Sequence, residues 1–235
     1  MVRWGLYSLR NLWARRVTTA LTVVGLGLVV FVLLAVLMLA HGLERTLGKT
    51  GDPENVIILR KGALSEIGSS LSREEIRAVA AQPDVRLTAD GRPLAVAEVG
   101  LQLTLRKGQG GSLTSVTLRG TAPEALAVRP AIRLIQGRLW KPGTTEIVVG
   151  ASIARQFPDA RVDRVLHFGN RAWTVVGVFE AGGSGFDSEV WGDAEQFLAT
   201  FHRATFSSMT LRLAHPATLP AFKDRIERDP RFKFS

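Results

Sequence analysis

Residues 17–40, VTTALTVVGLGLVVFVLLAVLMLA, contain no charged side chain. As an α-helix rising about 1.5 Å per residue they would span about 36 Å, compared with about 30 Å for the hydrocarbon core of a bilayer. A backbone in lipid has to satisfy its own hydrogen bonds, so we expect a helix despite the many valines. The alternative is a cleaved signal peptide, whose apolar region runs only about 7–15 residues before a small-residue cleavage site. Because His41-Gly42-Leu43-Glu44 is a poor cleavage site, the stretch predicts a retained transmembrane helix.

The residues before this helix predict its orientation. Residues 1–16 carry basic side chains with no acidic residue among them: Arg3, Arg10, Arg15 and Arg16. Short basic flanks stay in the cytoplasm, so we expect the N-terminus inside and the rest of the chain outside. Trp4 and Trp13 stand between these arginines, which is typical of an amphipathic segment at the inner membrane interface. The net charge of +9 therefore reflects topology and contact with membrane lipid, and we expect no nucleic-acid partner.

The helix is expected to continue beyond the bilayer. Leu39, Leu43 and Leu47 recur every four residues, as they do on one face of a helix. We therefore predict a stalk over residues 41–50, which Gly51-Asp52-Pro53 ends.

Residues 51–235 mix strand-like and helix-like patterns without a regular alternation, which indicates an α+β domain of two subdomains. We expect strands at residues 54–61, 94–107, 113–119, 146–149, 165–168, 172–179 and 206–213. A capping box at residues 72–75 predicts a helix that ends at Pro83, and further helices are expected at residues 152–157 and 219–228.

No pattern in the chain predicts a catalytic, cofactor-binding or metal-binding residue. The sequence contains no cysteine, which excludes disulfides, thiolate nucleophiles and cysteine zinc sites. Gly48-Lys49-Thr50 resembles the end of a phosphate-binding loop, but the glycine required five positions earlier is replaced by Leu43. The four histidines lack the spacing of a metal site. We therefore expect a protein that is not an enzyme.

Gly150-Ala151-Ser152 is the one motif that could indicate a serine nucleophile, because it lies between a strand and a helix. A membrane-anchored hydrolase would then need Asp187 and either His202 or His215 as partners. The simpler interpretation is that Ser152 is the N-cap of the helix. Asp187 and Glu189 alternate at a strand edge, and we expect both carboxylates to be solvated.

Several segments in a fixed order resemble the N-terminal part of an ABC transporter permease of the macrolide-exporter type. This superfamily also includes lipoprotein-release and cell-division permeases. The matching segments are Arg10-Asn11-Leu12 with Arg15-Arg16, residues 18–27, Arg119-Gly120 with Pro123, Gly137-Arg138, residues 146–154 with Gly150 and Ser152, and residues 175–179 with Gly177. Each segment is weakly specific alone, but together they cover nearly the whole chain.

The resemblance implies a periplasmic core domain that follows the first transmembrane helix, in a permease subunit of the inner membrane. It also implies a separate cytoplasmic ATPase that binds ATP, a second permease copy, and in Gram-negative cells an adaptor protein. In such a permease this chain binds no cofactor itself, and Gly137, Arg138, Gly150, Ser152 and Gly177 are structural residues.

The chain stops before the further transmembrane helices of that family, so we expect it to be a truncated product. The alternative is a complete single-pass, extracytoplasmic binding or scaffold module. The sequence does not indicate which substrate is transported.

Overall fold

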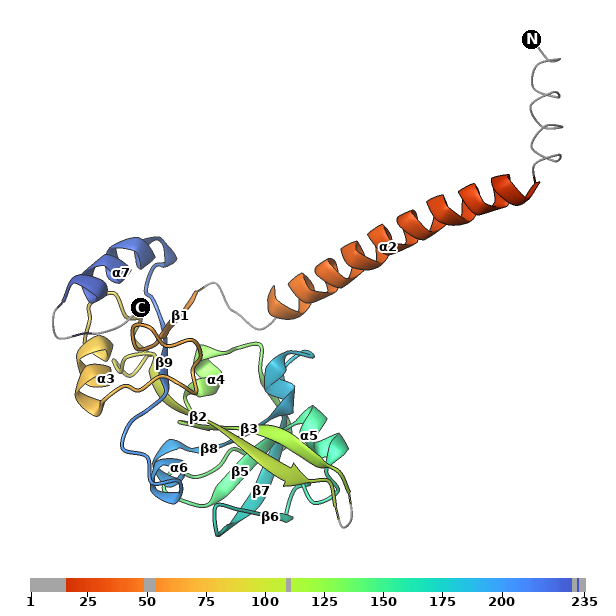
Figure 1. Ribbon diagram of the computed structural model, residues 1–235. Helices are drawn as coiled ribbons and strands as arrows, with labels where there is room; N and C mark the ends of the chain where they lie inside the picture. Colours follow the sequence, from red (N-terminus) through yellow and green to blue (C-terminus); the bar gives the residue numbers. More distant parts are fainter. Residues whose placement is uncertain (1–15, 49–53, 109–110, 230–231, 233–235) are drawn as a thin grey trace. The chain divides into compact units, whose positions relative to one another are not determined.

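The computed structural model describes residues 16–48, 54–108, 111–229 and 232, and side chains in the first of these segments up to residue 42. The chain forms two units, an N-terminal helix that ends at Gly48 and a folded body that follows it (Figure 1). Each unit is described by itself below.

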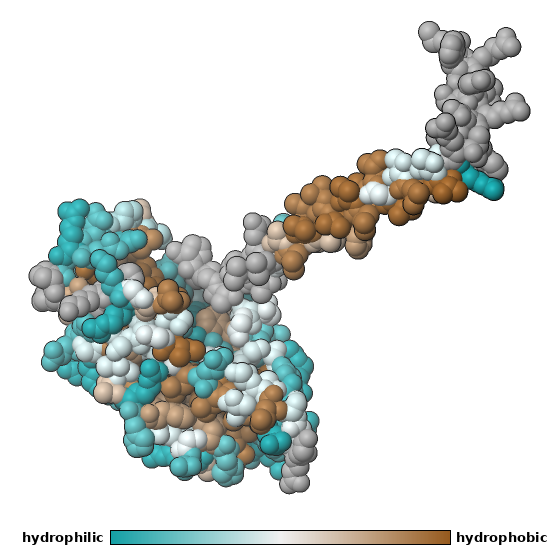
Figure 2. Space-filling view, in the orientation of Figure 1, coloured by the Kyte–Doolittle hydropathy of each residue, from teal (hydrophilic) through white to brown (hydrophobic). Residues whose placement is uncertain are grey.

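The apolar stretch forms the helix α2 (Arg16–Gly48). At about 1.5 Å per residue its 33 residues extend about 50 Å, which is longer than a bilayer core. Residues Arg16–Gly42 are apolar and long enough to cross a membrane, and none of the side chains described in them is buried. The apolar surface is visible along the rod in Figure 2. The helix therefore presents its side chains to a medium other than its own protein.

The described residues of the body form nine strands, which are β1 (Asn55–Ile58), β2 (Ala95–Arg106), β3 (Leu113–Thr121), β4 (Arg133–Gly137), β5 (Glu146–Gly150), β6 (Val165–Phe168), β7 (Arg171–Glu180), β8 (Glu189–Asp193) and β9 (Ser208–Arg212). Their order in the sheet is β1-β9-β2-β3-β8-β5-β7-β4, and β6 also pairs with β7. β3–β8 and β5–β7 are parallel, whereas the other pairs are antiparallel. This mixture confirms the α+β class.

Strand β2 belongs to two parts of the sheet. Its residues 95–98 pair with β9, and its residues 99–106 pair with β3. We call β1, β9 and residues 95–98 the first half-sheet, and residues 99–106 with β3 to β8 the second half-sheet. The two halves share one continuous strand, and the body that contains them is a single compact unit; the two subdomains expected from the sequence stay a prediction.

The first half-sheet is covered by the helices α3 (Arg73–Ala80) and α7 (Leu219–Arg228), which lie beside β1 and β9 in Figure 1. The capping box predicted for α3 is present, because Ser72 and Glu75 bond each other's backbone N–H groups. One apolar cluster joins both helices to the strands and includes Val79, Met209, Leu211, Phe222 and Ile226.

At its centre, on β5 and β8, the second half-sheet is buried on both faces. On β5, Ile147 and Val149 point into one apolar cluster, and Val148 points into another, as the alternation of side chains along a strand requires. The remaining short helices are α4 (Ala125–Val128), α5 (Ala151–Gln156), α6 (Ala194–Thr200), η1 (Gly185–Ser188) and η2 (Pro216–Thr218). Because both faces are covered there, a movement of these central strands has to displace packed side chains.

A tight turn joins β6 to β7. Gly169 and Asn170 both have positive φ values, 59° and 57°, which suit the two central residues of a hairpin turn that follows the twist of the strands. Trp173 then closes this hairpin, since its Nε1 donates to the carbonyl oxygen of Phe168 at 3.1 Å.

Gly150 lies where the backbone of β5 touches η1, and we predict that Gly150→Ala destabilises the body by about 2 kcal/mol or more. A Cβ at this position would lie 2.3 Å from the carbonyl oxygen of Asp187, so the backbone would have to move. Urea unfolding of the full chain, followed by the fluorescence of its buried tryptophans, measures the effect. Gly185→Ala is the matched control, because a Cβ there meets nothing within 4 Å; an equal loss in both variants would contradict the prediction.

Candidate functional site

A group of charged side chains is buried at the point where β2 changes partners. Glu98 is the last residue of β2 in register with β9, and Val99 is the first in register with β3. The Glu98 side chain is fully buried. We call Glu98, Arg119, Arg129 and Glu189 the ionic junction.

The Glu98 carboxylate accepts hydrogen bonds from three side chains. Arg129, which follows α4, donates from Nη1 to Oε1 at 3.0 Å and from Nη2 to Oε2 at 2.5 Å. Thr210 Oγ1 on β9 donates to Oε2 at 2.8 Å, and Arg119 Nη1 on β3 is 3.4 Å from the same oxygen. The carboxylate thus joins β9 of the first half-sheet to β3 of the second.

Arg119 is held by a second carboxylate, that of Glu189 on β8. Its Nε and Nη2 donate to the two oxygens of Glu189 at 2.8 and 2.9 Å, which is the bidentate geometry that strengthens such pairs. The indole Nε1 of Trp191 also donates to Glu189 Oε2 at 2.7 Å. Glu66, in the segment between β1 and α3, accepts from Arg119 Nη1 at 2.9 Å.

The ring of Phe186 completes the junction. The guanidinium carbons of Arg119 and Arg129 each lie 5.2 Å from its centroid, within the range of cation–π attraction. The ring thus attracts both guanidinium groups, whose like charges are offset by the Glu98 carboxylate that they share.

The ionisation of the junction follows from these contacts. Burial alone would raise the pKa of Glu98, but the charges of Arg129 and Arg119 outweigh burial, and its pKa lies below the ordinary value. Burial likewise opposes the charged form of Arg119, but Glu189 and Glu98 raise its pKa well above the ordinary value. Two arginines and two glutamates therefore form a charged and mutually neutralising group.

The sequence did not reveal the junction. No sequence pattern pointed to Glu98 or Arg129, and Arg119 belongs only to a segment of the family resemblance. The one available signal was a lone glutamate in the otherwise apolar segment AVAEVG, residues 95–100, because a charge on a buried strand needs a partner. The prediction that Asp187 and Glu189 are solvated is wrong: both are buried, and Asp187 accepts from the backbone N–H groups of Ala181 and Gly183 at 2.7 Å.

Three of the structural residues named from the sequence lie together at the contact of β4 and β7. Gly137 and Gly177 are register partners, and Gly137 has a φ of 72°. A Cβ on Gly177 would lie 2.4 Å from the carbonyl oxygen of Arg138. Arg138 then donates through Nη1 and Nη2 to both oxygens of Glu146 at 2.7 and 2.6 Å, and so connects the end of β4 to the start of β5.

The other two, Gly150 and Ser152, lie at the start of α5. The prediction that Ser152 caps this helix is wrong, because Gly150 occupies the N-cap and no side chain caps it. Ser152 Oγ instead accepts a hydrogen bond from Arg155 Nη2 at 3.1 Å. Since Asp187 is engaged by backbone N–H groups, this arrangement does not support a hydrolase triad.

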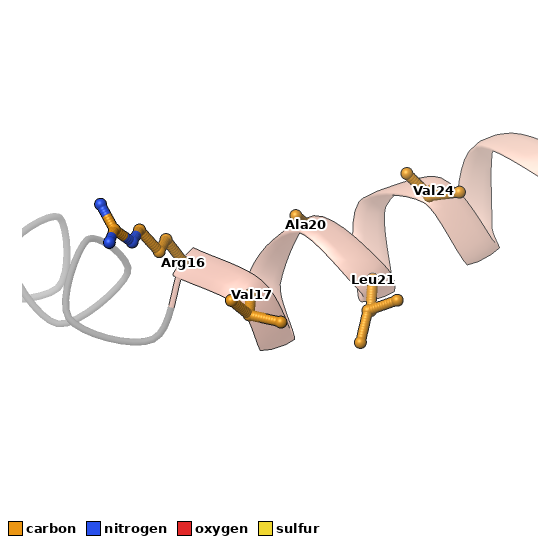
Figure 3. Close-up of a pocket in the computed structure, with 5 residues that line it drawn as sticks. All are labelled: Arg16, Val17, Ala20, Leu21 and Val24. Atoms are coloured by element: carbon orange, nitrogen blue, oxygen red, sulfur yellow. The ribbon is translucent and has the colours of Figure 1, made fainter.

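The residues expected to anchor the helix are only partly described. Arg16, Val17, Ala20, Leu21 and Val24 line a shallow apolar hollow on the first turns of α2 (Figure 3). Leu39 is exposed. The other predicted anchoring and stalk side chains lie outside the described side chains: Arg3, Trp4, Arg10, Trp13, Arg15, Leu43 and Leu47. Among the described residues, no group of three or more His, Cys, Asp or Glu could hold a metal ion.

Residues 19–229 match the family model of the MacB-like periplasmic core domain. No curated protein is similar enough to match the sequence.

Two solved structures share the fold. The periplasmic region of MacB from Actinobacillus actinomycetemcomitans is 14% identical, with a TM-score of 0.59; the match covers 77% of this chain and 87% of that one. The extracellular domain of the noncanonic ABC-type transporter YknZ from Gram-positive bacteria is 15% identical, with a TM-score of 0.56; that match covers 72% of this chain and 88% of the other.

We predict that Glu98→Gln lowers the free energy of unfolding of the body by about 3–5 kcal/mol, because it leaves a buried arginine charge without compensation. Urea unfolding of the full chain measures the loss. Glu195→Gln is the control: Glu195 pairs with Arg73 at an exposed position, where we expect a loss of less than about 1 kcal/mol. Similar losses in the two variants would show that burial of the junction does not matter.

The Arg138–Glu146 pair predicts a dependence of stability on pH. Hydrogen bonding to Arg138 lowers the pKa of Glu146 from 4.5 to about 2. A lowered pKa in the folded state stabilises the protein above pH 4.5, and this contribution disappears as the pH falls from 4.5 to about 2. The difference in thermal midpoint between the wild type and Glu146→Gln should therefore shrink over this window. Glu180→Gln, at the exposed end of β7, is the control and should show no such convergence.

Proposed function

Because the chain belongs to the family of MacB-like periplasmic core domains, which are components of ABC transporter permeases, we propose that it is a permease subunit of an ABC exporter. In this proposal the chain transmits movement, driven by a separate cytoplasmic ATPase, to its extracytoplasmic body. The chain itself binds no nucleotide, and ATP is bound by the partner subunit.

The observation that carries the proposal is the length of α2. The helix is continuous from Arg16 to Gly48, so it exceeds a bilayer core of about 30 Å by roughly four turns. We assign residues 17–40 to the membrane, residues 41–50 to a stalk and residues 51–235 to the body. A helix is stiff along its axis. Six residues lie between the end of this helix at Gly48 and the start of β1 at Asn55. A displacement of the helix is therefore transmitted to the sheet through a short connection.

The body is suited to receive such a displacement. The junction ties the half-sheet that contains β1 to the half-sheet that contains β3 and β8. A body joined in this way can move without its halves separating, as transmission of movement requires.

The orientation and partners are also part of the proposal. The arginines of residues 1–16 place the N-terminus in the cytoplasm and the body on the other side of the inner membrane. Arg16 at the start of α2 suits contact with lipid headgroups. A second copy of the permease and a periplasmic adaptor are the further partners that we propose.

The test uses the absence of native cysteine. A spin label on Ile135→Cys, at an exposed position of β4, reports the distance between two copies in nanodiscs that also contain the ATPase subunit. We expect ATP to change this distance. Leu43→Pro should abolish the change, because proline in a helix interior removes a hydrogen bond and costs about 3 kcal/mol or more.

Leu43→Ala is the control, because alanine keeps the helix intact, and it should retain the ATP-dependent change. Digestion of intact spheroplasts by added protease checks that each variant is inserted with its body outside. A wild-type distance that ATP does not alter, or an equal alteration in Leu43→Pro, would rule out transmission through the helix.

A further inference from the structure

The segment of residues 59–70, between β1 and α3, contacts the ionic junction through Glu66. We call it the strap. Three residues of the strap contact the body. Glu66 bonds Arg119 at 2.9 Å, and Ile67 packs on Gly100, where a Cβ would lie 3.4 Å from the Ile67 Cγ1. At the base of the strap, Ser70 Oγ donates to Thr205 Oγ1 at 3.1 Å. Gly100 and Arg119 are register partners across β2 and β3. The strap therefore clamps the strand pair that begins immediately after Glu98.

The charge balance of the junction does not require the strap. Arg119 and Arg129 are already matched by Glu98 and Glu189, so Glu66 is a third carboxylate for two guanidinium groups. Its side chain is 28% exposed, whereas that of Glu98 is 0% exposed. When Glu66 leaves, Arg119 Nη1 keeps Glu98 Oε2 at 3.4 Å. The strap can thus lift without leaving an unpaired charge in the core, which is the usual obstacle to breaking a buried ion pair.

The strap also carries its own internal hydrogen bonds. At its base, Ser69 Oγ accepts from the Arg60 backbone N–H at 2.8 Å, and the Ser70 carbonyl oxygen accepts from Arg60 Nη1 at 2.8 Å. Compact loops of this kind have ends that are close together and keep their shape as a unit. At the tip of the strap, Leu64 is fully exposed. The outer side of the strap is therefore not buried against the body.

We propose that the strap is a latch that opens as a unit from the junction while the sheet remains folded. Because the strap begins directly after β1, a displacement of the stalk would reach it through that strand. This inference rests on the proposed function for its driving force, and in the exporter the latch opens when the ATPase binds ATP. Local openings of such segments occur at far lower free energy than global unfolding.

The first test is hydrogen exchange of the full chain in lipid nanodiscs, compared between wild type and Glu66→Gln. Glutamine keeps the size of the side chain but removes the charge from the contact with Arg119. We expect exchange of the strap amides to rise about 10-fold, with no change in β2 and β3. An equal rise in strap and strands, or no rise in the strap, would overturn the latch.

A disulfide provides the opposite variant. In Ile67→Cys/Gly100→Cys the Cβ position on Gly100 lies 4.0 Å from the Cα of residue 67, which is compatible with a disulfide, and no native cysteine competes. Oxidation should slow strap exchange, and a reductant should restore it. Ile67→Cys alone is the control and should not respond to oxidation. Strap exchange that is unchanged by the disulfide would also overturn the latch.

The third test adds the ATPase subunit. ATP should accelerate strap exchange in the wild type but not in the oxidised double-cysteine variant. If ATP changes the distance reported from position 135 without changing strap exchange, the latch is wrong and the proposed function stands. If ATP changes neither, both are wrong.

Discussion

The body depends on the neutralisation of one carboxylate. Glu98 is fully buried, and a buried carboxylate remains ionised only if opposite charges and hydrogen bonds replace its water. Its partners come from β3, β9 and the residue that follows α4, and Arg119 brings in Glu189 from β8. These segments are far apart in the sequence, so satisfying one side chain fixes the relative position of most of the sheet. The same residue is the point at which β2 passes from one half-sheet to the other.

Stability alone does not explain the ionic junction, and the chain's membership of a transporter family suggests a further role for it. Replacing a buried ion pair with apolar residues is often neutral or stabilising, so the junction is not needed simply to hold a fold together. Charged groups with fixed directions do specify which partners meet. A strand shared by two half-sheets benefits from that specificity, because apolar packing alone would allow the halves to slide over each other.

Local patterns predicted most of the elements. The charge-free run predicted α2, the capping box predicted α3, and strand-like patterns predicted β2 and β3. These signals depend on residues that are neighbours in the chain, and the sequence therefore contains them directly. The glycines at 137, 150 and 177 were noted as motif residues, but only the structure shows which backbone approaches each of them.

The junction could not be predicted in the same way. Whether Glu189 is solvated or paired depends on Arg119, which lies 70 positions away, and no local pattern links them. The prediction for Ser152 was wrong for a related reason. A serine near a helix start is typical of a cap, but in the folded backbone Gly150 occupies the N-cap position. In both cases the folded backbone and its contacts overruled the interpretation that the local sequence favoured.

The pairing of β1 with β9 joins residues 55–58 to residues 209–212, and this separation bears on how the protein is made. Pairings between such distant segments form late, because a long loop has to close first. β1 comes early in the body, whereas its partner β9 comes much later in the chain. During that interval the apolar side chains of β1 and α3 have no completed half-sheet to cover them. Folding of this protein therefore includes a period in which β1 is an unpaired edge strand that is open to aggregation.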